Sequence, residues 1–154
     1  MLTPASPDFE ALRALNNEHA QELSFADAPR FAHLIAQAFF AQAIGTEAFL
    51  IAFDQDAAYD SPNFLWFRQR FSRFIYVDRV VTAQAARGRG YAAGLYNAMF
   101  AAARAAGHER VTCEINADPP NPGSEAFHAK FGFQEIGSAL LPNGKTVRYY
   151  ERRL

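Results

Sequence analysis

The chain has 154 residues, half of them hydrophobic, and a formal net charge of −1. A chain of this length can bury one substantial core, so we expect a single domain over residues 1–154. The balanced charge gives no reason to expect nucleic acid or an anionic membrane surface as a partner, and any anion site must therefore be local.

The cysteine count and the first residues bear on the compartment. A single cysteine, Cys113, cannot form an internal disulfide framework. The start MLTPASPDFE lacks the charged and apolar regions of a signal peptide, and no apolar run approaches the roughly 20 residues that span a bilayer. We therefore expect a cytoplasmic protein without a membrane segment.

Two stretches of the first third carry helix signals at their starts. Asp8 can cap one helix, and Asp27, with Pro29 two residues on, can open another. The first carries Phe9, Leu12 and Leu15, and the second carries Phe31, Leu34, Ile35, Ala38 and Phe39. We expect Gly45 to end the second helix.

Two strands and a clear helix are predicted next. The apolar run 48–53 and the β-branched, aromatic run 73–83 are typical of buried strands. Residues 54–64 between them predict an acidic, proline-containing loop. The alanine-rich run 91–106 has helical periodicity and is closed by Gly107.

The last third of the chain also alternates between strand and helix signals. Residues 110–116 predict a strand, 124–131 a short helix, and two last strands flank the turn 142–145. The order strand, glycine loop, helix, strand predicts a right-handed crossover that joins a parallel pair.

Residues 85–96, AARGRGYAAGLY, place two glycines and two arginines between a strand and a helix. Unpaired N–H groups at the start of the helix, together with its dipole, favour a phosphate. Gly88 and Gly90 leave room for close approach, and Arg87 and Arg89 can place cations beside it. A plain turn with solvated arginines is the alternative.

A dinucleotide-binding loop is a second interpretation of the same residues. Gly88, Gly90 and Ala93 fit the pattern G-x-G-x-x-A, and Glu114 follows where a ribose-binding acid belongs. Against this, residues 82–86 separate the strand from the loop, and too little chain follows to complete a doubly wound sheet.

Two motifs together resemble the GNAT-type N-acetyltransferase superfamily. RGRGYA, 87–92, matches its acyl-CoA pyrophosphate loop R/Q-x-x-G-x-G/A, and NPGSEAFHAKFGF, 121–133, resembles its segment N-x-x-A-x-x-F/L-Y-x-x-x-G-F. The resemblance covers 74–140 well and the N-terminal third loosely, and YDSPNFLWF with YVDRVV is similar to a bacterial branch of the superfamily. It implies an α/β (α+β) single domain, with a mixed central sheet that is splayed between two parallel strands and flanked by helices.

The resemblance also implies an activity. It is acetyl transfer from acetyl-CoA to a primary amine by direct attack in a ternary complex, without a metal. The pantetheine arm would lie between strands 74–83 and 110–117 and pair with strand backbone. Coenzyme A would contact Val80, Val81, Thr82, Arg87, Gly88, Arg89, Gly90, Tyr91, Ala92, Asn121, Ser124, Phe127 and His128. The amine acceptor is unknown, and a homodimer is common among similar proteins.

A general base is useful, because deprotonating a lysine-like amine with a pKa near 10.4 costs about 4.6 kcal/mol at pH 7. Asp78 is the first candidate, since strand alternation puts it on one face with Val80 and Thr82, where apolar neighbours would raise its pKa. A salt bridge within the sheet is the alternative for Asp78. Glu114 is the second candidate, with a solvated or structurally paired residue as the alternative. A backbone N–H near Val81 would polarise the thioester carbonyl.

His128 departs from the family pattern, because it stands where a tyrosine usually protonates the departing thiolate. Imidazolium can fill that role, since its ordinary pKa of about 6.5 leaves roughly a quarter protonated at pH 7. His128 could also bond the sulfur, bind the acceptor, act as the base or be structural. Asn121 would contact the pantetheine arm or, alternatively, form the turn before Pro122.

Other kinds of site are set against this interpretation. The aromatic stretch 59–71, with Asp56 and Asp60 nearby, could bind an amine or form core, and its arginines could suggest single-stranded nucleic acid, which the balanced charge opposes. The histidines show no metal-ligand spacing, and Glu114, on the opposite strand face, cannot serve Cys113 as a base. A non-catalytic acyl-CoA-binding module of the same fold is the rival from another functional class.

Overall fold

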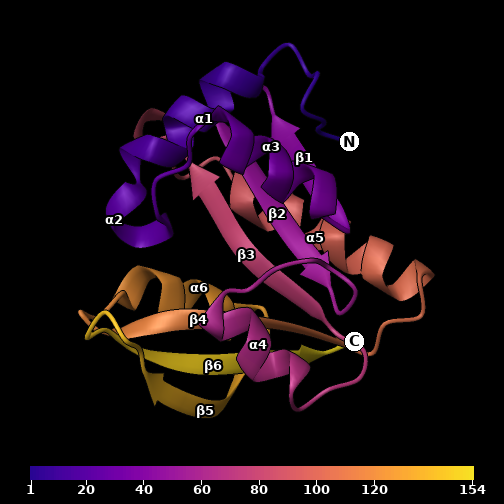
Figure 1. The fold of residues 1–154 in the computed structure, drawn as a ribbon, viewed down its shortest axis with the longest axis vertical. Helices are drawn as coiled ribbons and strands as arrows, with labels where there is room; N and C mark the ends of the chain where they lie inside the picture. The colour runs from indigo at the N-terminus through magenta and orange to yellow at the C-terminus, as the bar shows by residue number, and fades with distance from the viewer.

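The fold is a six-stranded mixed sheet with helices on both faces (Figure 1). A computed structural model describes residues 1–154, apart from the side chain of Glu22. The elements are α1 (Phe9–Glu18), α2 (Ala20–Leu23), α3 (Ala28–Gln37), β1 (Phe40–Ile44), β2 (Ala48–Asp54), α4 (Pro62–Arg68), β3 (Ile75–Thr82), a short 3-10 turn (Gln84–Ala86), α5 (Tyr91–Ala105), β4 (Arg110–Asp118), α6 (Pro122–Lys130), β5 (Gln134–Leu140) and β6 (Thr146–Arg153). None of the helices described has the length and hydropathy to cross a bilayer.

The sheet order is β1-β2-β3-β4-β6-β5. Strands β3 and β4 run parallel, and every other neighbouring pair is antiparallel. The parallel pair predicted around the glycine loop is confirmed, and the later elements end within two residues of their expected bounds.

The two N-terminal helices are confirmed, with differences at their ends. The Asp27 side chain accepts a hydrogen bond from the Arg30 backbone N–H at 2.9 Å, which caps α3. Asp8 stands at the N-cap of α1, but its side chain makes no capping hydrogen bond. The first turn of α1 is therefore capped less well than the sequence suggests.

The expected continuation of the second helix to Gly45 is wrong. Helix α3 ends at Gln37, and residues 40–44 form β1, whose five residues pair with β2. Gly45, with φ 53°, makes the turn between these strands. A short apolar run has no periodicity that separates helix from strand, so pairing with the buried strand β2 decides its structure.

The expected loop over 54–64 is also too long. Its end, from Pro62, belongs to α4, and the proline lies at the first helical position, where its missing N–H costs nothing. Phe64 and Phe67 of this helix are fully buried. The aromatic stretch is thus largely core, as one of its two interpretations held.

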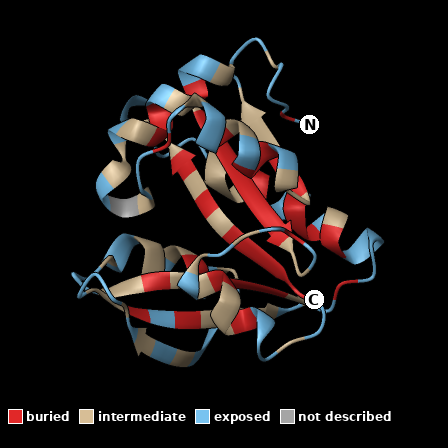
Figure 2. Cartoon of the chain, in the orientation of Figure 1, coloured by how far each residue is buried: buried red, intermediate tan, exposed pale blue. Residues whose placement is uncertain are grey.

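Two layers of apolar side chains enclose the first half of the sheet. In β2, Phe49, Ile51 and Phe53 belong to the cluster under α1, α3 and α4, whereas Ala48, Leu50 and Ala52 belong to the cluster under α5. Figure 2 shows this strand almost wholly buried between the layers. β2 and its neighbour β3 therefore form a rigid support for whatever β3 carries.

Strands β3 and β4 separate soon after they meet. Their paired residues are Ile75 with Val111 and Tyr76 with Thr112. Beyond these, β3 continues beside β2, and β4 continues beside β6, so the two halves of the sheet diverge (Figure 1). This confirms the predicted splay and leaves backbone of both strands facing the gap.

A β-bulge interrupts β3 where it leaves β4. Val77 pairs with Ala52 and Arg79 with Ile51, which leaves Asp78 as the extra residue. Asp78 therefore faces Tyr59 on the α4 side, while Val80 packs with the cluster under α5. The expectation that Asp78, Val80 and Thr82 share one face is wrong, because simple alternation does not survive a bulge.

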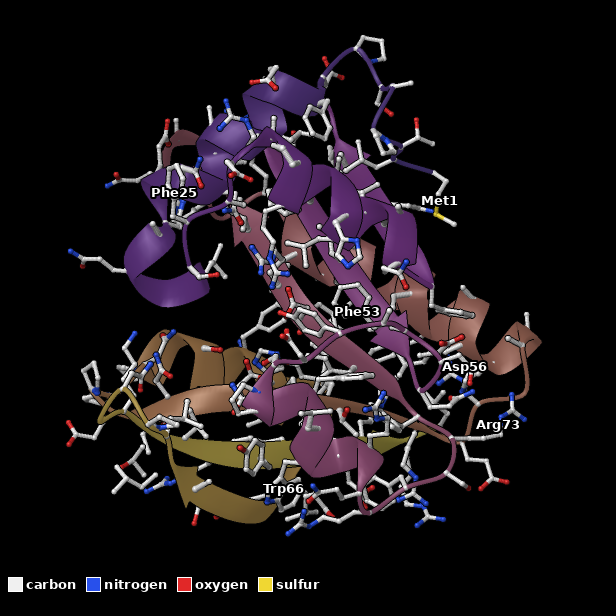
Figure 3. All side chains as sticks on the ribbon, in the orientation of Figure 1. Met1, Phe25, Phe53, Asp56, Trp66 and Arg73 are labelled. Carbon is white, nitrogen blue, oxygen red and sulfur yellow. The ribbon has the colours of Figure 1, made fainter. Side chains whose placement is uncertain are left out.

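Trp66 fixes α4 on the second half of the sheet. Its ring stacks on Tyr149 of β6, with centroids 4.1 Å apart, and Arg70 covers it at 3.6 Å. Gly137 of β5 makes room for the ring, since a Cβ there would lie 2.5 Å from Trp66 Cζ2. Figure 3 shows Trp66 pointing from α4 toward these strands.

We expect Gly137→Ala to destabilise the fold by about 1–3 kcal/mol, because Trp66 is held on both faces and cannot yield to the added methyl group. Urea unfolding measures the change. Gly94→Ala is the matched control: it lies inside α5 with nothing within 4 Å of the added Cβ, and should gain about 0.5–1 kcal/mol. Equal stability of Gly137→Ala and wild type would contradict the packing described.

Candidate active site

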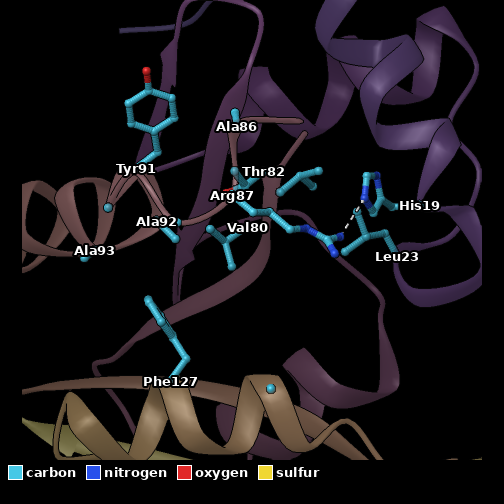
Figure 4. A pocket seen from close by; sticks show the side chains of 14 residues that line it. His19, Leu23, Val80, Thr82, Ala86, Arg87, Tyr91, Ala92, Ala93 and Phe127 are labelled. Atoms are coloured by element: carbon cyan, nitrogen blue, oxygen red, sulfur yellow. Dashed lines mark hydrogen bonds between the residues drawn. The ribbon is translucent and has the colours of Figure 1, made fainter. Parts of the chain in front are cut away.

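A cavity of about 460 Å³ opens beside the glycine loop (Figure 4). The end of β3, the loop and the start of α5 form one wall, and His19, Leu23 and α6 residues form the other. The lining includes the predicted residues Val80, Val81, Thr82, Arg87, Gly88, Gly90, Tyr91, Ala92 and Phe127. The structure thus brings together most of the residues that the resemblance assigned to coenzyme A.

The two glycines have left-handed backbone conformations. Gly88 has φ 81°, and Gly90, the N-cap of α5, has φ 77°. A Cβ at either position would meet no atom within 4 Å. The glycines are therefore required by the backbone turn, and their open surface lets an anion reach the first N–H groups of α5.

The two arginines of the loop point to different partners. Arg87 Nη2 lies 3.5 Å from His19 Nε2, the contact drawn in Figure 4, and His19 Nδ1 donates to the Leu15 carbonyl at 3.1 Å. Arg89 Nη1 lies 3.5 Å from Glu47 Oε1, with both side chains about half exposed, and does not line the cavity. Arg87 is thus the loop cation placed at the cavity.

A smaller cavity of about 140 Å³ lies between β3 and β4. Among its lining residues are Val77, Asp78, Arg79 and Val80 of β3, Cys113, Glu114, Ile115 and Asn116 of β4, and Tyr96, Asn121, Ser124 and His128. We call this cavity the slot. Asn121 is the N-cap of α6, because its Oδ1 accepts a hydrogen bond from the Ser124 N–H at 3.2 Å.

His128 lies buried beside the slot with both ring nitrogens engaged. Nδ1 is 2.7 Å from the Ser124 carbonyl, which can only accept, so the proton is assigned to Nδ1. Nε2, 2.6 Å from the Tyr96 hydroxyl, then accepts a hydrogen bond from that phenol. Burial lowers the pKa of His128, so the neutral imidazole dominates at pH 7, and less imidazolium is present than its ordinary pKa suggests.

Asp78 is held in a buried ion pair. Its Oδ2 accepts from Arg79 Nε at 2.6 Å, and its Oδ1 accepts from the Tyr59 hydroxyl at 2.6 Å. The side chains of Asp78 and Arg79 are only 5% and 3% exposed. Arg79 Nη1 also donates to Asn16 Oδ1 of α1 at 2.8 Å. The salt bridge considered for Asp78 is confirmed, and both its oxygens are engaged.

Glu114 has a different environment one strand away. Its Oε2 accepts a hydrogen bond from the Tyr76 hydroxyl at 2.7 Å. Burial raises the pKa of Glu114 to about 7, although the Tyr76 hydrogen bond acts in the opposite direction. A carboxyl group with this pKa exchanges a proton readily near neutral pH.

A third cavity of about 450 Å³ adjoins the slot, and we call it the acceptor cavity. It shares Asp78, Arg79, Glu114 and Asn116 with the slot. Its other lining residues include Gln21 and Ser24 near α2, Tyr59 and Asn63 near α4, Tyr76, and Asn143 and Lys145 of the β5–β6 turn. Glu114 therefore stands where the two spaces join.

Several residues of the site were not predicted from the sequence, and Tyr59 was expected only as part of the aromatic stretch 59–71 that could bind an amine or form core. Tyr59 and Tyr76 contact the two carboxylates, and Asn63 accepts a hydrogen bond from Tyr149 at 2.9 Å. Lys145 and His19 arrive from turns and short helices. A polar tip on an otherwise buried aromatic is the signal that could have singled out the tyrosines, whereas nothing local marks Lys145 or His19.

Two alternative interpretations do not fit the structure. The sheet has one short parallel contact rather than a doubly wound parallel order, so the dinucleotide-binding fold is wrong. Cys113 is buried and its pKa is raised well above its ordinary value by that burial, which disfavours a thiolate nucleophile.

Comparison with known proteins gives the same fold and a family. Residues 58–133 match the Acetyltransferase (GNAT) family. No curated protein matches the chain. Three similar solved structures are ribosomal-protein-alanine N-acetyltransferase from Brucella melitensis (18% identity, TM-score 0.70, 99% of this chain and 97% of that one), Ard1 from Thermoplasma volcanium (11%, 0.72, 99% and 94%) and the NatC complex bound to Gag peptide and CoA (10%, 0.72, 99% and 95%).

At these identities the structural likeness shows the fold alone. The family match covers the stretch that includes β3, the glycine loop, β4 and α6, the elements that build the cavities. The comparisons therefore show an N-acetyltransferase fold, with a match to the GNAT acetyltransferase family over residues 58–133, just under half of the chain.

Proposed function

We propose that the protein is a GNAT acetyltransferase that transfers the acetyl group of acetyl-CoA to a primary amine by direct attack in a ternary complex, with Glu114 as the general base. One observation carries the proposal: the half-buried carboxyl group of Glu114, with its pKa raised to about 7, stands at the junction of the slot and the acceptor cavity. The acceptor reaches the thioester from the far side of this junction.

The diphosphate of acetyl-CoA lies on the loop, against the N–H groups at Gly88, Gly90 and the start of α5, with Arg87 beside it. Helix dipole and open glycine backbone support this placement. Further into the slot, the pantetheine arm follows β3 past Val80, with Asn121 and Ser124 opposite. The unpaired edge of β3 beyond Tyr76 supplies backbone groups for the arm.

The reaction then balances without a metal or a covalent enzyme intermediate. Glu114 takes one proton from the ammonium group of the acceptor, and the neutral nitrogen attacks the thioester carbonyl. A β3 backbone N–H near Val81 stabilises the developing oxyanion. As the carbon–sulfur bond breaks, one of the two protons on nitrogen passes to the departing sulfur, the other stays on the amide product, and Glu114 releases its own proton to water.

Asp78 and His128 take supporting roles in this proposal. Both carboxylate oxygens of Asp78 are already engaged, one by Arg79 and one by the Tyr59 hydroxyl, so Asp78 holds the geometry of the site and we do not assign it as the base. His128 donates from Nδ1 to the Ser124 carbonyl and accepts at Nε2 from the Tyr96 hydroxyl, so we assign it a structural role in the lining of the slot. We therefore reverse the order of candidates drawn from the sequence and place Glu114 first.

The proposal also covers the cellular compartment and the oligomeric state of the protein. We place it in the cytoplasm, because a lone buried cysteine suits a reducing compartment. We also include a homodimer in the proposal. Light scattering on the purified chain measures its mass, and a monomeric mass at micromolar concentration would contradict the homodimer.

We expect Gly90→Asp to abolish binding of acetyl-CoA, because the added carboxylate would meet the diphosphate at the start of α5. At a hundred times the dissociation constant, acetyl-CoA should stabilise the wild type by about 2.7 kcal/mol, and a thermal-shift titration measures this. Gly45→Asp is the matched control, since Gly45 also has positive φ but lies in the β1–β2 turn. A normal shift in Gly90→Asp would contradict the placement of the diphosphate.

We expect Glu114→Gln to lower kcat by about 10²–10⁴-fold, since it removes the base. In the wild type, kcat/KM should decrease as the pH falls below an apparent pKa near 7, and the variant should lose this acidic limb of the pH profile. Thiol release from acetyl-CoA, followed from pH 5 to 9, measures both. An unchanged acidic limb in the variant contradicts the role of Glu114, and a wild type that binds acetyl-CoA but releases no thiol with any amine supports the binding-module alternative.

Stability provides the control for this variant. Because the folded pKa of Glu114 is above its ordinary value of 4.5, the carboxyl destabilises the fold progressively as pH rises from about 4.5 to 7. Glu114→Gln should therefore match the wild type at pH 4 and exceed its stability by about 2–3 kcal/mol at pH 8, allowing for partial exposure. Lost activity in a more stable protein is not a folding defect.

A further inference from the structure

The charged groups that line the acceptor cavity are few. The described lining residues include two acids, Asp78 and Glu114, and two bases, Arg79 and Lys145. Asp78 and Arg79 neutralise each other at 2.6 Å with almost no exposure. One carboxyl group and one ammonium group are left to face an acceptor, so the cavity is matched to neither a polycation nor a polyanion.

Lys145 is held in place over this cavity. The β5–β6 turn is fixed by the hydrogen bonds from Leu141 N–H to the Lys145 carbonyl at 2.8 Å and from Lys145 N–H to Asn143 Oδ1 at 3.0 Å. From there Lys145 Nζ donates to the Gln21 carbonyl at 2.9 Å, beside α2. An ammonium group has three N–H donors, so this contact leaves donors for a ligand.

The strand register sets the separation of the two charges. Glu114 pairs with Tyr149, whereas Asp118 pairs with Thr146, the residue after Lys145. Four residues of β4 thus separate Glu114 from the level of Lys145, which is about 13 Å between backbones. The Glu114 carboxylate is held by Tyr76 and the Lys145 ammonium group by Gln21, so the two charges face the cavity from backbone positions much farther apart than the single carbon that separates amine from carboxylate in an α-amino acid.

We propose, on the basis of the function proposed above, that the acceptor is a small primary amine that carries a carboxylate several bonds away, such as an ω-amino acid or a dipeptide. The amine end lies at Glu114 and the carboxylate at Lys145. Between them, the side-chain amides of Gln21, Asn63 and Asn116 offer hydrogen bonds to a polar body such as a peptide group. The cavity volume of about 450 Å³ suits a ligand of this size.

Matched acceptor pairs test this inference: ε-aminohexanoate against its primary amide, and glycylglycine against its amide, with thiol release from acetyl-CoA measured on the full chain. We expect kcat/KM for the carboxylate of at least one pair to exceed that of the amide about tenfold. Lys145→Met should bring the ratio close to one, and Lys145→Arg should keep it. Lys130→Met, an exposed lysine on α6, is the matched control and should leave the ratio unchanged.

The outcomes separate this inference from the proposed function. Equal rates for carboxylate and amide in both wild-type pairs, or a preference that Lys145→Met leaves intact, overturn the carboxylate acceptor while acetyl transfer stands. Thiol release only with alkylamines that carry no carboxylate would also overturn the carboxylate acceptor while acetyl transfer stands. If no amine of any kind releases thiol, the proposed function fails as well. Melting curves of each variant exclude unfolding as the cause.

Discussion

The early separation of β3 from β4 is the constraint on which the rest of the site depends. Two parallel strands that paired along their full length would satisfy each other's backbone and leave no space between them. Here the pairing ends at Tyr76 and Thr112, and each strand is held instead by its antiparallel neighbour. Because β2 is buried on both faces, the edge of β3 stays open without unfolding.

The bulge at Asp78 and its ion pair connect this opening to the N-terminal helices. Asp78 bonds Tyr59 near α4, and Arg79 bonds Asn16 of α1, which in turn donates to the Ser24 carbonyl at 3.1 Å. The α1–α2 segment is thereby fixed over both large cavities. A buried pair of this kind stabilises geometry more than it stabilises the fold, since desolvation of both charges opposes their attraction. It also leaves Glu114 as the carboxyl group free to exchange a proton.

The local sequence was sufficient for the cavity beside the glycine loop. Gly88 and Gly90 needed left-handed backbone at a helix start, and a motif of fixed spacing reports such a need directly. The parallel pair followed from the order strand, glycine loop, helix, strand, whereas α5 followed from its own periodicity and the splay from the family resemblance. By contrast, the run 40–44 was assigned to a helix, because its partner strand, and not its own pattern, makes it β1.

The acceptor side depends on contacts that no short stretch contains. Asp78 was ranked first because alternation was counted through a bulge that only the register with β2 reveals. The pKa of Glu114 depends on burial by segments far apart in the chain, and Lys145 reaches Gln21 across 124 positions of sequence. His128 was expected to supply a proton, but its burial lowers its pKa and favours the neutral form, although the Ser124 hydrogen bond acts in the opposite direction.

Hydrogen–deuterium exchange with and without saturating acetyl-CoA tests the central claim most directly, with NAD as the comparison ligand. If the opened edge of β3 holds the acyl-bearing arm and the glycine loop holds the diphosphate, acetyl-CoA should slow exchange in peptides that cover 77–82 and 87–92, and NAD should not. Unchanged exchange over 77–82 with acetyl-CoA, or an equal response to NAD, would contradict the account.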